Sequence, residues 1–401
     1  GFFDTGYIIL KGQLPVRDYW AYTGITVDYF QSFFFLLFGG NWNSYIIHSS
    51  TINVISSLIF YFFLLDIKIS KLFSLFYTLS FATLLYPVSG TPFAYLHAYI
   101  FSLLGLMIFF LLNDSKKRKF LVFIPAIYLL AFFSMQTPTI YIGFILLILI
   151  FYIVISQKDF YLIKIIFLGG VSSIIFLLAY LVITNTNLID FFYQYFLFPI
   201  SIADGRIASE ADAYVRLSDQ LNLKRIFGDF KFIHIFLIPL IFLILKKPAN
   251  IKKNYLYLKI VVFIFCTILL IYNQLLQANQ IYIFSLIPVL GALLHAVIKE
   301  SDYKKKSALS WFLILIIALV SIKYHYRFNV DRKFIDLENV SKNIGFRANQ
   351  IHSNFNDLYW VTRLKNAEED KIFLQKVLKI LDKERQNSYV FTHYQFFSTL
   401  L

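Results

Sequence analysis

The chain has 401 residues, of which 59% are hydrophobic and only 15% are charged, and its mean hydropathy is +0.67. This composition excludes a water-soluble globular protein, because so much apolar surface could not be folded away from water in a chain of this length. The formal net charge of +14 has to be interpreted with a membrane in mind, and the composition predicts an integral membrane protein.

The chain opens with "GFFDTGYIILKGQLPVRDYW", in which Asp4, Arg17 and Asp18 stand directly ahead of very apolar sequence. The segment "ITVDYFQSFFFLLFGG" at 25–40 follows. It has helical spacing, with phenylalanine and leucine on one side and Asp28, Gln31 and Ser32 on the other. This pattern predicts an amphipathic helix that lies along the membrane interface. We therefore expect residues 1–42 to form an outer segment that does not cross the bilayer.

Apolar runs recur along the rest of the chain at about the length that a helix needs to cross a hydrocarbon core of roughly 30 Å. They are apolar on every side, which indicates helices and excludes the alternating pattern of a barrel. We expect ten spans, at 43–65, 72–86, 94–112, 120–134, 137–155, 162–183, 232–245, 260–275, 281–298 and 309–322.

The connecting segments alternate in charge. "NDSKKRK" (113–119), "KKPANIKK" (246–253) and "KESDYKKK" (299–306) are strongly basic, whereas the intervening turns "PVSGTP", "MQTP" and "LQAN" contain no Lys or Arg. Lys and Arg concentrate on the cytoplasmic side, so residues 1–42, 184–231 and 323–401 are expected outside, in the periplasm of a bacterium. The charge is thus a topology signal, and no nucleic-acid partner is expected. The single cysteine, Cys266, lies within a span, so no internal disulfide is expected.

Polar side chains gather at the outer ends of the expected spans. The candidates for substrate binding are His48, His97, Gln136 and Gln280. Polar groups at membrane depth are costly unless they face a bundle interior or a water-filled cavity, so their shared side predicts an outward-opening polar site. For any single residue, an interfacial position or a hydrogen bond between helices remains the alternative.

The long outer loop at 184–231 contains further charges, with Arg206 beside Asp204 and Gly205. The planar guanidinium donates two parallel hydrogen bonds and keeps its charge, so it suits the phosphate of a lipid. A solvated loop with balanced charges is the alternative for this segment.

The tail at 323–401 predicts a small soluble α/β domain. "NAEEDKIFLQKVLKILDKERQ" (366–386) has an N-cap at Asn366, acids in its first turn and bases in its last turn, which is typical of a helix. "LYWVT" before it and "SYVFTHYQ" after it have the composition of strands, so a β-α-β unit is expected. That unit is incomplete at Leu401, and we expect the chain to be a fragment at both ends.

Several segments resemble the multi-spanning glycosyltransferases of the GT-C fold, in the bacterial protein mannosyltransferase-like branch. They are "DTGYIILKGQLPVRDYW", the amphipathic helix that ends in "LLFG", "FFSMQTPTIYIG", "FFYQYFLFPISIADGR", "NQIYIFSLIP" and "THYQFFSTLL". The resemblance implies a first transmembrane helix ahead of Gly1 and an outer segment with an essential acidic residue. It also implies a polyprenyl-phosphate-linked sugar as donor and a glycan, lipid or protein as acceptor.

The implied chemistry assigns roles to the outer residues. Sugar transfer to a hydroxyl needs a base for the acceptor proton and positive charge for the departing phosphate. Asp4 is the first candidate for the base or for a metal ligand, Asp18 is the second, and Arg17 or Arg206 is the candidate for holding phosphate. Arg17 and Asp18 could equally pair with each other in a structural turn. The resemblance leaves Mg²⁺ or Mn²⁺ as a candidate cofactor, since no residue spacing here is specific for a metal.

Two other classes of protein fit part of the pattern. A membrane polymerase or ligase of O-antigen is also polytopic and acts on polyprenyl-linked glycans, but it would place its functional arginines in later outer segments. A transporter or flippase should show internal repeats and interrupted helices near mid-membrane. The sequence shows no convincing repeat and almost no charge at mid-span, so the transporter ranks third.

Overall fold

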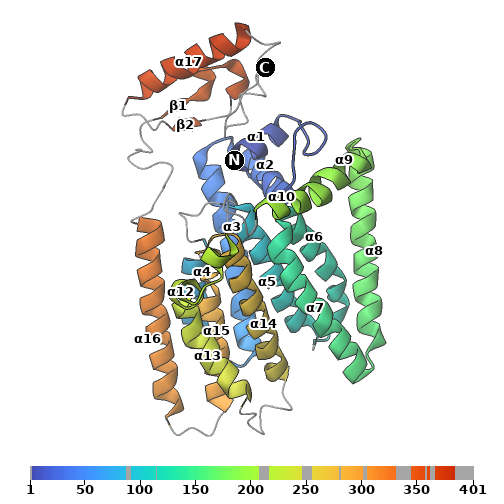
Figure 1. Ribbon diagram of the computed structural model, residues 1–401, viewed down its shortest axis with the longest axis vertical. Helices are drawn as coiled ribbons and strands as arrows, with labels where there is room; N and C mark the ends of the chain where they lie inside the picture. Colours follow the sequence, from blue (N-terminus) through green and yellow to red (C-terminus); the bar gives the residue numbers. More distant parts are fainter. Residues whose placement is uncertain are drawn as a thin grey trace.

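The computed structural model describes residues 2–86, 92–113, 115–206, 216–245, 255–279, 281–300, 305–330, 345–356, 359–361 and 366–383. Helices dominate these residues and run mostly along the long axis of the molecule (Figure 1). The bundle consists of α3 (Trp42–Asp66), α4 (Lys71–Leu85), α5 (Ala94–Asn113), α6 (Ile124–Ser134), α7 (Gln136–Gln157), α8 (Phe160–Ile183), α13 (Lys231–Leu245), α14 (Tyr255–Leu276), α15 (Leu286–Glu300) and α16 (Lys306–His325). Short helices η1 (Arg118–Phe123), η3 (Ile281–Ile283) and η4 (Tyr326–Val330) adjoin α6, α15 and α16.

All ten expected spans fall on helices, and a helical bundle of the expected kind is therefore confirmed. Six helices among the described residues, α3, α5, α7, α8, α14 and α16, are long and apolar enough to cross a membrane. The bent pair α12 and α13, with an angle of 92° between them, would make a seventh if it is one span. The other helices are shorter, because 3₁₀ turns or bends take up part of each apolar run. The protein is thus a multi-pass helical membrane protein, and the full count of ten stays an expectation.

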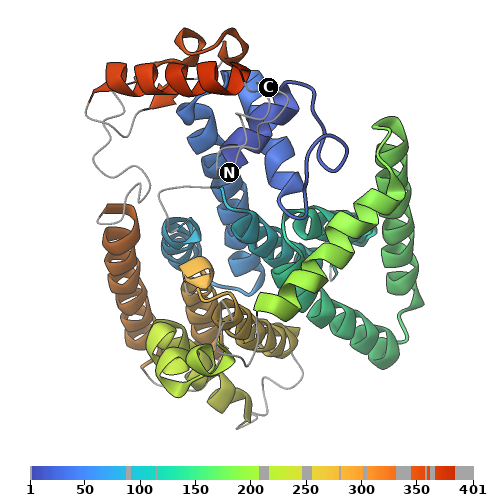
Figure 2. The same ribbon diagram turned by 45° about the horizontal axis from the view of Figure 1, so that its top comes forward.

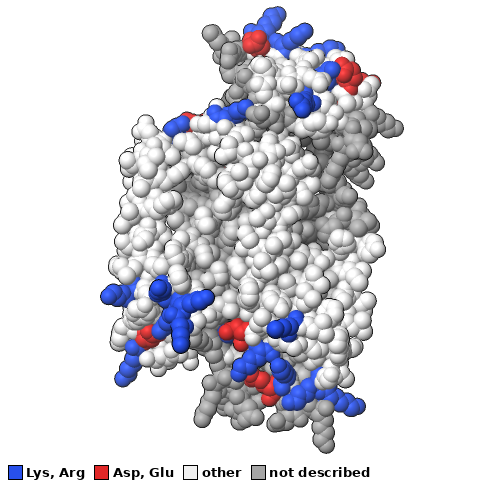
Figure 3. Space-filling model, turned by 180° about the vertical axis from the view of Figure 1, so that it is seen from behind, with Lys and Arg blue, Asp and Glu red and all other residues white. Residues whose placement is uncertain are grey.

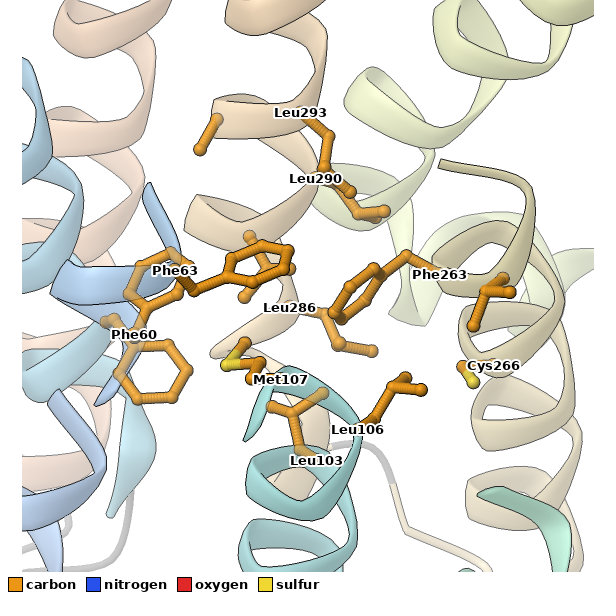
Figure 4. Close-up of a cluster of buried hydrophobic side chains, with 14 of the residues drawn as sticks. Phe60, Phe63, Leu103, Leu106, Met107, Phe263, Cys266, Leu286, Leu290 and Leu293 are labelled. Carbon is orange, nitrogen blue, oxygen red and sulfur yellow. The ribbon is translucent and has the colours of Figure 1, made fainter. Parts of the chain in front are cut away.

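A continuous apolar core joins α3, α5, α14 and α15 at the centre of the bundle (Figure 4). Phe60 and Phe63 from α3 face Met107 of α5, and Phe263 of α14 approaches the Phe63 ring with 5.5 Å between centroids. Cys266 is free and fully buried here. The close packing of these helices fixes where their polar ends meet.

The two ends of the bundle differ in charge. Lys and Arg gather at the end away from α17, and the middle of the face seen in Figure 3 is almost free of charge. Two ion pairs tie helices together at this basic end: Asp66 with Lys259, and Arg118 with Asp159. A charge-free band between charged ends is what a hydrocarbon layer requires, and the alternation of basic loops agrees with it.

Short helices cover the opposite end of the bundle, here called the outer end. They are α1 (Phe2–Leu10), α2 (Ile25–Phe38), α9 (Leu188–Phe192), η2 (Tyr193–Leu197), α10 (Phe198–Arg206), α11 (Leu217–Gln220) and α12 (Leu223–Asp229). Figure 2 turns this end forward and shows α9, η2 and α10 as one rod that crosses the bundle. The expected loop at 184–231 therefore contains substantial helix, since Asn187 and Asn222 both cap helix N-termini with their side chains.

The described part of the tail sits on the outer end, next to α1 (Figures 1 and 2). It has β1 (Gly345–Arg347), η6 (Ala348–Gln350), η7 (Ser353–Phe355), β2 (Tyr359–Val361) and α17 (Ala367–Lys383). The strand predicted at "LYWVT" and the helix predicted after Asn366 are confirmed, and the Asn366 side chain accepts the Glu368 N–H. The sheet is a two-stranded antiparallel pair of β1 with β2. The strand expected at "SYVFTHYQ" lies outside the described residues.

Candidate functional site

The N-terminus of α2 is anchored on the C-terminus of α6. The last carbonyl groups of a helix have no partner within that helix. Here the Ser134 carbonyl accepts from the Gly24 N–H at 2.9 Å and from the Thr23 hydroxyl at 3.0 Å, and the Leu130 carbonyl accepts from the Thr26 hydroxyl at 2.8 Å. These bonds place α2 across the outer end of the bundle and set its rotation.

The rotation of α2 turns its polar face into the protein and its apolar face outward. Asp28, Gln31 and Ser32 are buried, whereas Phe33, Leu36, Leu37 and Phe38 are exposed. An apolar outward face is what a helix bordered by lipid presents, since its polar groups must then find partners inside the protein. The expected amphipathic helix is thus present, and its polar side is occupied by other parts of the chain.

Asp28 is the carboxylate buried most deeply at this end, with 2% of its surface exposed. The Thr5 hydroxyl of α1 donates to its Oδ1 atom. Burial raises the pKa of Asp28 well above the usual value for an aspartate, the hydrogen bond from Thr5 opposes that rise, and the nearby charge of Asp4 adds to it. Burial also raises the pKa of Asp4. Asp4 and Asp28 are therefore close enough for the charge of Asp4 to act on Asp28, and we call them the carboxylate pair.

Two histidines meet beside this carboxylate pair. His48 of α3 and His97 of α5 lie with their Nε2 atoms 3.1 Å apart, and both rings are buried. His48 Nδ1 lies 2.9 Å from the amide of Gln31, which is one helical turn beyond Asp28 on α2. His97 Nδ1 lies 3.1 Å from the Phe93 carbonyl oxygen, and Phe34 stacks on the His48 ring at 5.2 Å.

The donors and acceptors available to Phe93, His97, His48 and Gln31 determine the direction of each hydrogen bond between them. The Phe93 carbonyl can only accept, so His97 donates from Nδ1 and accepts at Nε2, and His48 donates from Nε2 and accepts at Nδ1. The Gln31 amide as placed has Oε1 toward His48 Nδ1, and its Nε2 group has no hydrogen-bond partner among the described residues. Turning this amide so that its NH₂ group faces His48 lets Gln31 donate to Nδ1 and keeps both rings neutral. This arrangement avoids a charge on a buried imidazole.

Close packing brings α1, which carries Asp4 and Thr5, against α2. A Cβ atom on Gly6 would lie 2.7 Å from both Cβ and Cγ of Gln31, so only glycine allows this approach. On its other side α1 packs on the tail, where the Tyr7 and Phe355 rings lie 6.5 Å apart and Leu374 of α17 joins the same apolar cluster. The tail therefore helps to hold the carboxylate pair in place.

Arg17 and Asp18 lie apart from this buried cluster and are bound to each other. Arg17 donates from Nε and Nη2 to the Asp18 carboxylate at 2.9 and 2.7 Å, and from Nη1 to the Thr184 carbonyl at 2.9 Å. Asp18 also accepts the Leu14 N–H at 2.7 Å. The hydrogen bond from Arg17 lowers the pKa of Asp18. This geometry favours the structural alternative, a turn that ties the N-terminal segment to the end of α8.

Two glutamine side chains clamp the segment between α1 and α2. Gln136 donates to the Tyr22 and Tyr195 carbonyl groups at 2.8 and 3.1 Å. Gln194 donates to the Val16 carbonyl at 3.1 Å and accepts the Ala21 N–H at 2.9 Å. Gln136 is thus engaged with the backbone and lies apart from the histidine pair.

The remaining candidates fall outside what the structure describes. Arg206 ends α10, but its side chain is outside the described part, and Gln280 lies outside the described residues altogether. Within the described ranges, no group of three or more His, Cys, Asp or Glu side chains is arranged to hold a metal ion.

Of the residues singled out in the sequence, Asp4, His48 and His97 lie in this candidate site, together with Asp28, Gln31 and Thr5, which the sequence did not single out as site residues. Asp28 and Gln31 were assigned to the polar side of an interfacial helix, which would face headgroups. The available signal was their spacing of three residues within a very apolar helix, since polar groups at such positions tend to face protein.

Comparisons of the chain with protein-family models, with curated proteins and with solved structures gave no significant match.

Proposed function

We propose that this chain is an integral membrane glycosyltransferase of the GT-C type, which moves a sugar from a polyprenyl-phosphate donor to an acceptor hydroxyl. The observation that carries the proposal is the carboxylate pair, in which Asp28 is buried and Asp4 is partly buried, at the end of the bundle opposite the basic loops. In a bacterium this end would face the periplasm from the inner membrane. The resemblance of the N-terminal segment to GT-C enzymes supports the same assignment, because it implies an acidic residue there.

In this proposal Asp28 acts as the general base. The acceptor oxygen bonds to the anomeric carbon of the sugar, the bond from that carbon to the phosphate oxygen breaks, and polyprenyl phosphate leaves with the bonding electrons. The acceptor proton passes to the Asp28 carboxylate. A carboxyl group with a raised pKa suits this step, because a base works best when its pKa lies near the working pH. Burial is the main cause of that raised pKa, and the nearby charge of Asp4 adds to it.

The setting of α2 suits a donor that is carried by a lipid. The helix that holds Asp28 on its inner face exposes Phe33, Leu36 and Leu37 on its outer face. A polyprenyl chain in the bilayer could lie along that apolar face with its head group near the carboxylate pair. Arg206, at the end of α10, is the remaining candidate for the phosphate, since Arg17 uses three of its N–H groups on Asp18 and Thr184.

The test is turnover by the full-length protein in liposomes. A panel of polyprenyl-phosphate sugars is supplied with candidate acceptors, and release of polyprenyl phosphate is measured. Asp28→Asn should lower kcat by about 10²-fold or more, which is the usual contribution of a general base. Asp4→Asn should lower it less, and Asp18→Asn, at the exposed turn, should leave it nearly unchanged.

Thermal unfolding of each variant separates loss of chemistry from loss of fold. Full turnover by a folded Asp28→Asn variant would exclude Asp28 as the base. The proposed function itself fails if the wild-type protein consumes none of the lipid-linked sugars.

A further inference from the structure

A second polar cluster lies at the outer end of the bundle, where α5, α7, α14 and η3 meet. The Tyr95 hydroxyl donates to Asn273 Oδ1 at 2.8 Å, and the Tyr282 N–H donates to Gln274 Oε1 at 3.3 Å. The Tyr95 and Tyr282 rings stack with 5.2 Å between centroids, and the Tyr141 and Tyr272 rings meet edge to face at 6.4 Å. We call this the amide-tyrosine cluster: Tyr95, Tyr141, Tyr272, Asn273, Gln274 and Tyr282.

Gln274 has hydrogen-bonding capacity that the described protein does not use. Its side chain is 0% exposed, and its Nε2 group makes no hydrogen bond of ordinary geometry among the described residues, although the Tyr95 hydroxyl lies close enough to interact with it. A buried donor without an acceptor destabilises a fold by about 1 to 3 kcal/mol. Such a group is retained more easily where it serves a ligand that supplies the missing acceptor.

The chemistry of the cluster suits a neutral ligand with several hydroxyl groups. Tyrosine hydroxyls and the side-chain amides of Asn and Gln together offer donors and acceptors without charge. A sugar hydroxyl likewise donates and accepts, and the tyrosine rings supply flat apolar surface for the carbon skeleton. A phosphate would be matched by Arg or Lys, and the six residues of the cluster include neither.

The cluster adjoins the candidate site through the first turn of α5. Phe93, whose carbonyl accepts from His97, packs its ring on Tyr282 at 5.8 Å, and Tyr95 lies two residues before His97. Tyr272 is 40% exposed, so the cluster reaches the surface of the protein. Phe93 and Tyr95 thus place this uncharged cluster next to the histidine pair, along the first turn of α5.

From these contacts we infer that the amide-tyrosine cluster binds the hydroxyl groups of a sugar, with Gln274 Nε2 as a donor to one of them. The inference deepens the proposed function. It rests on that function only for the statement that a lipid carries the sugar. Sugar binding itself follows from the chemistry of the cluster. A site that pairs a hydroxyl with buried amide groups discriminates strongly against ligands that lack that hydroxyl.

The experiment measures Kd for three kinds of probe on the full chain in detergent: methyl glycosides, polyprenyl-phosphate sugars, and polyprenyl phosphate without sugar. Gln274→Leu and Tyr95→Phe should each weaken binding of the sugar-bearing probes about tenfold, as expected for one or two lost hydrogen bonds. Binding of polyprenyl phosphate alone should not change. Gln277→Leu, one turn further along the same helix end, is the matched control and should bind all probes as the wild type does.

The outcomes separate this inference from the proposed function. Unchanged binding of sugar-bearing probes by both folded variants would overturn the inference, and so would a wild type that binds neither methyl glycosides nor lipid-linked sugars. Binding of methyl glycosides that depends on Gln274, without any turnover of polyprenyl-phosphate sugars, would keep the sugar site and overturn the glycosyltransferase. Tyr95→Phe keeps the test decisive if Gln274→Leu does not fold.

Discussion

At the scale of single residues, the two aspartates Asp28 and Asp18 at the outer end differ in burial and therefore in titration behaviour. Asp28 is buried with a second carboxyl group nearby, and this environment disfavours a negative charge more than the hydrogen bond from Thr5 favours it. Asp18 is the contrast, since Arg17 neutralises it at the surface. The same side chain therefore has opposite titration behaviour at two positions only ten residues apart in the sequence.

The raised pKa of Asp28 predicts a stability that depends on pH. The folded protein holds the Asp28 proton more tightly than the unfolded chain does, so the free energy of unfolding falls as pH rises from the ordinary aspartate pKa toward the raised one. Asp28→Asn keeps the shape of the neutral acid but cannot ionise, so its free energy of unfolding should not fall in this way as the pH rises. Its melting temperature relative to the wild type should rise as the pH increases from about 4, the ordinary aspartate pKa.

Asp18→Asn serves as the control of opposite sign. Its carboxyl pKa is lowered by Arg17, so the stability it contributes is present above the unfolded pKa and is lost as pH falls. The effect should be small because the pair is exposed. Thermal melting across that pH range checks both variants, and a difference for Asp28→Asn that does not vary with pH would contradict the assignment.

At the scale of elements, the site depends on the close approach of two short helices. Helix α1 reaches α2 only because Gly6 faces Gln31, and α2 is held by the free carbonyl groups at the end of α6. The tail adds apolar contacts on the far side of α1. These helices are too short to be stable alone, so their positions depend on such contacts.

Substitution of Gly6 tests this packing. Gly6→Ala should destabilise the fold by about 1 to 3 kcal/mol, as overpacked sites do, and should lower turnover by moving Thr5 and Asp4 away from Asp28. Gly170→Ala, in α8, is the matched control: no heavy atom lies within 4 Å of its added Cβ, so a helix should gain up to about 1 kcal/mol. Equal melting temperatures for the two variants would show that the contact of α1 with α2 is unimportant.

At the scale of the whole molecule, charged and polar groups are distributed unevenly along the bundle axis. The basic loops of the bundle lie at one end, the candidate site and the tail, which has Lys and Arg of its own, lie at the other, and the band between them is almost free of charge (Figure 3). Six helices fit a crossing of that band, and the shorter ones fill the bundle between them. The candidate site therefore lies at one end of the bundle, away from the basic loops.

Cysteine labelling tests this orientation. In a Cys266→Ser background, Lys11→Cys, at the end of α1, and Lys117→Cys, in the basic loop after α5, are both exposed positions. A thiol reagent that does not cross the membrane should label position 11 from the outer side of intact cells and position 117 only after the cells are opened. Labelling of both positions from one side would exclude the orientation and, with it, the proposed site.

The sequence alone determined that this protein lies in a membrane, where the helices of its bundle fall along the chain, and at which end of the bundle the basic loops lie. The length of an apolar segment and the distribution of lysine along the chain are local properties, and neither depends on which helices pack together. Asp4, His48 and His97 could be assigned to the outer end on the same grounds.

Tertiary structure alone decided which of these groups meet. His48 and His97 are 49 residues apart in the sequence and lie 3.1 Å apart, and Thr5 reaches Asp28 across a close contact of α1 with α2. Helical periodicity shows that Asp28 and Gln31 share a face, but it does not show whether that face meets lipid headgroups or protein. That choice depends on the anchor at Ser134 and on the space left by Gly6, because the free energy of burying a polar face depends on the partners that close over it.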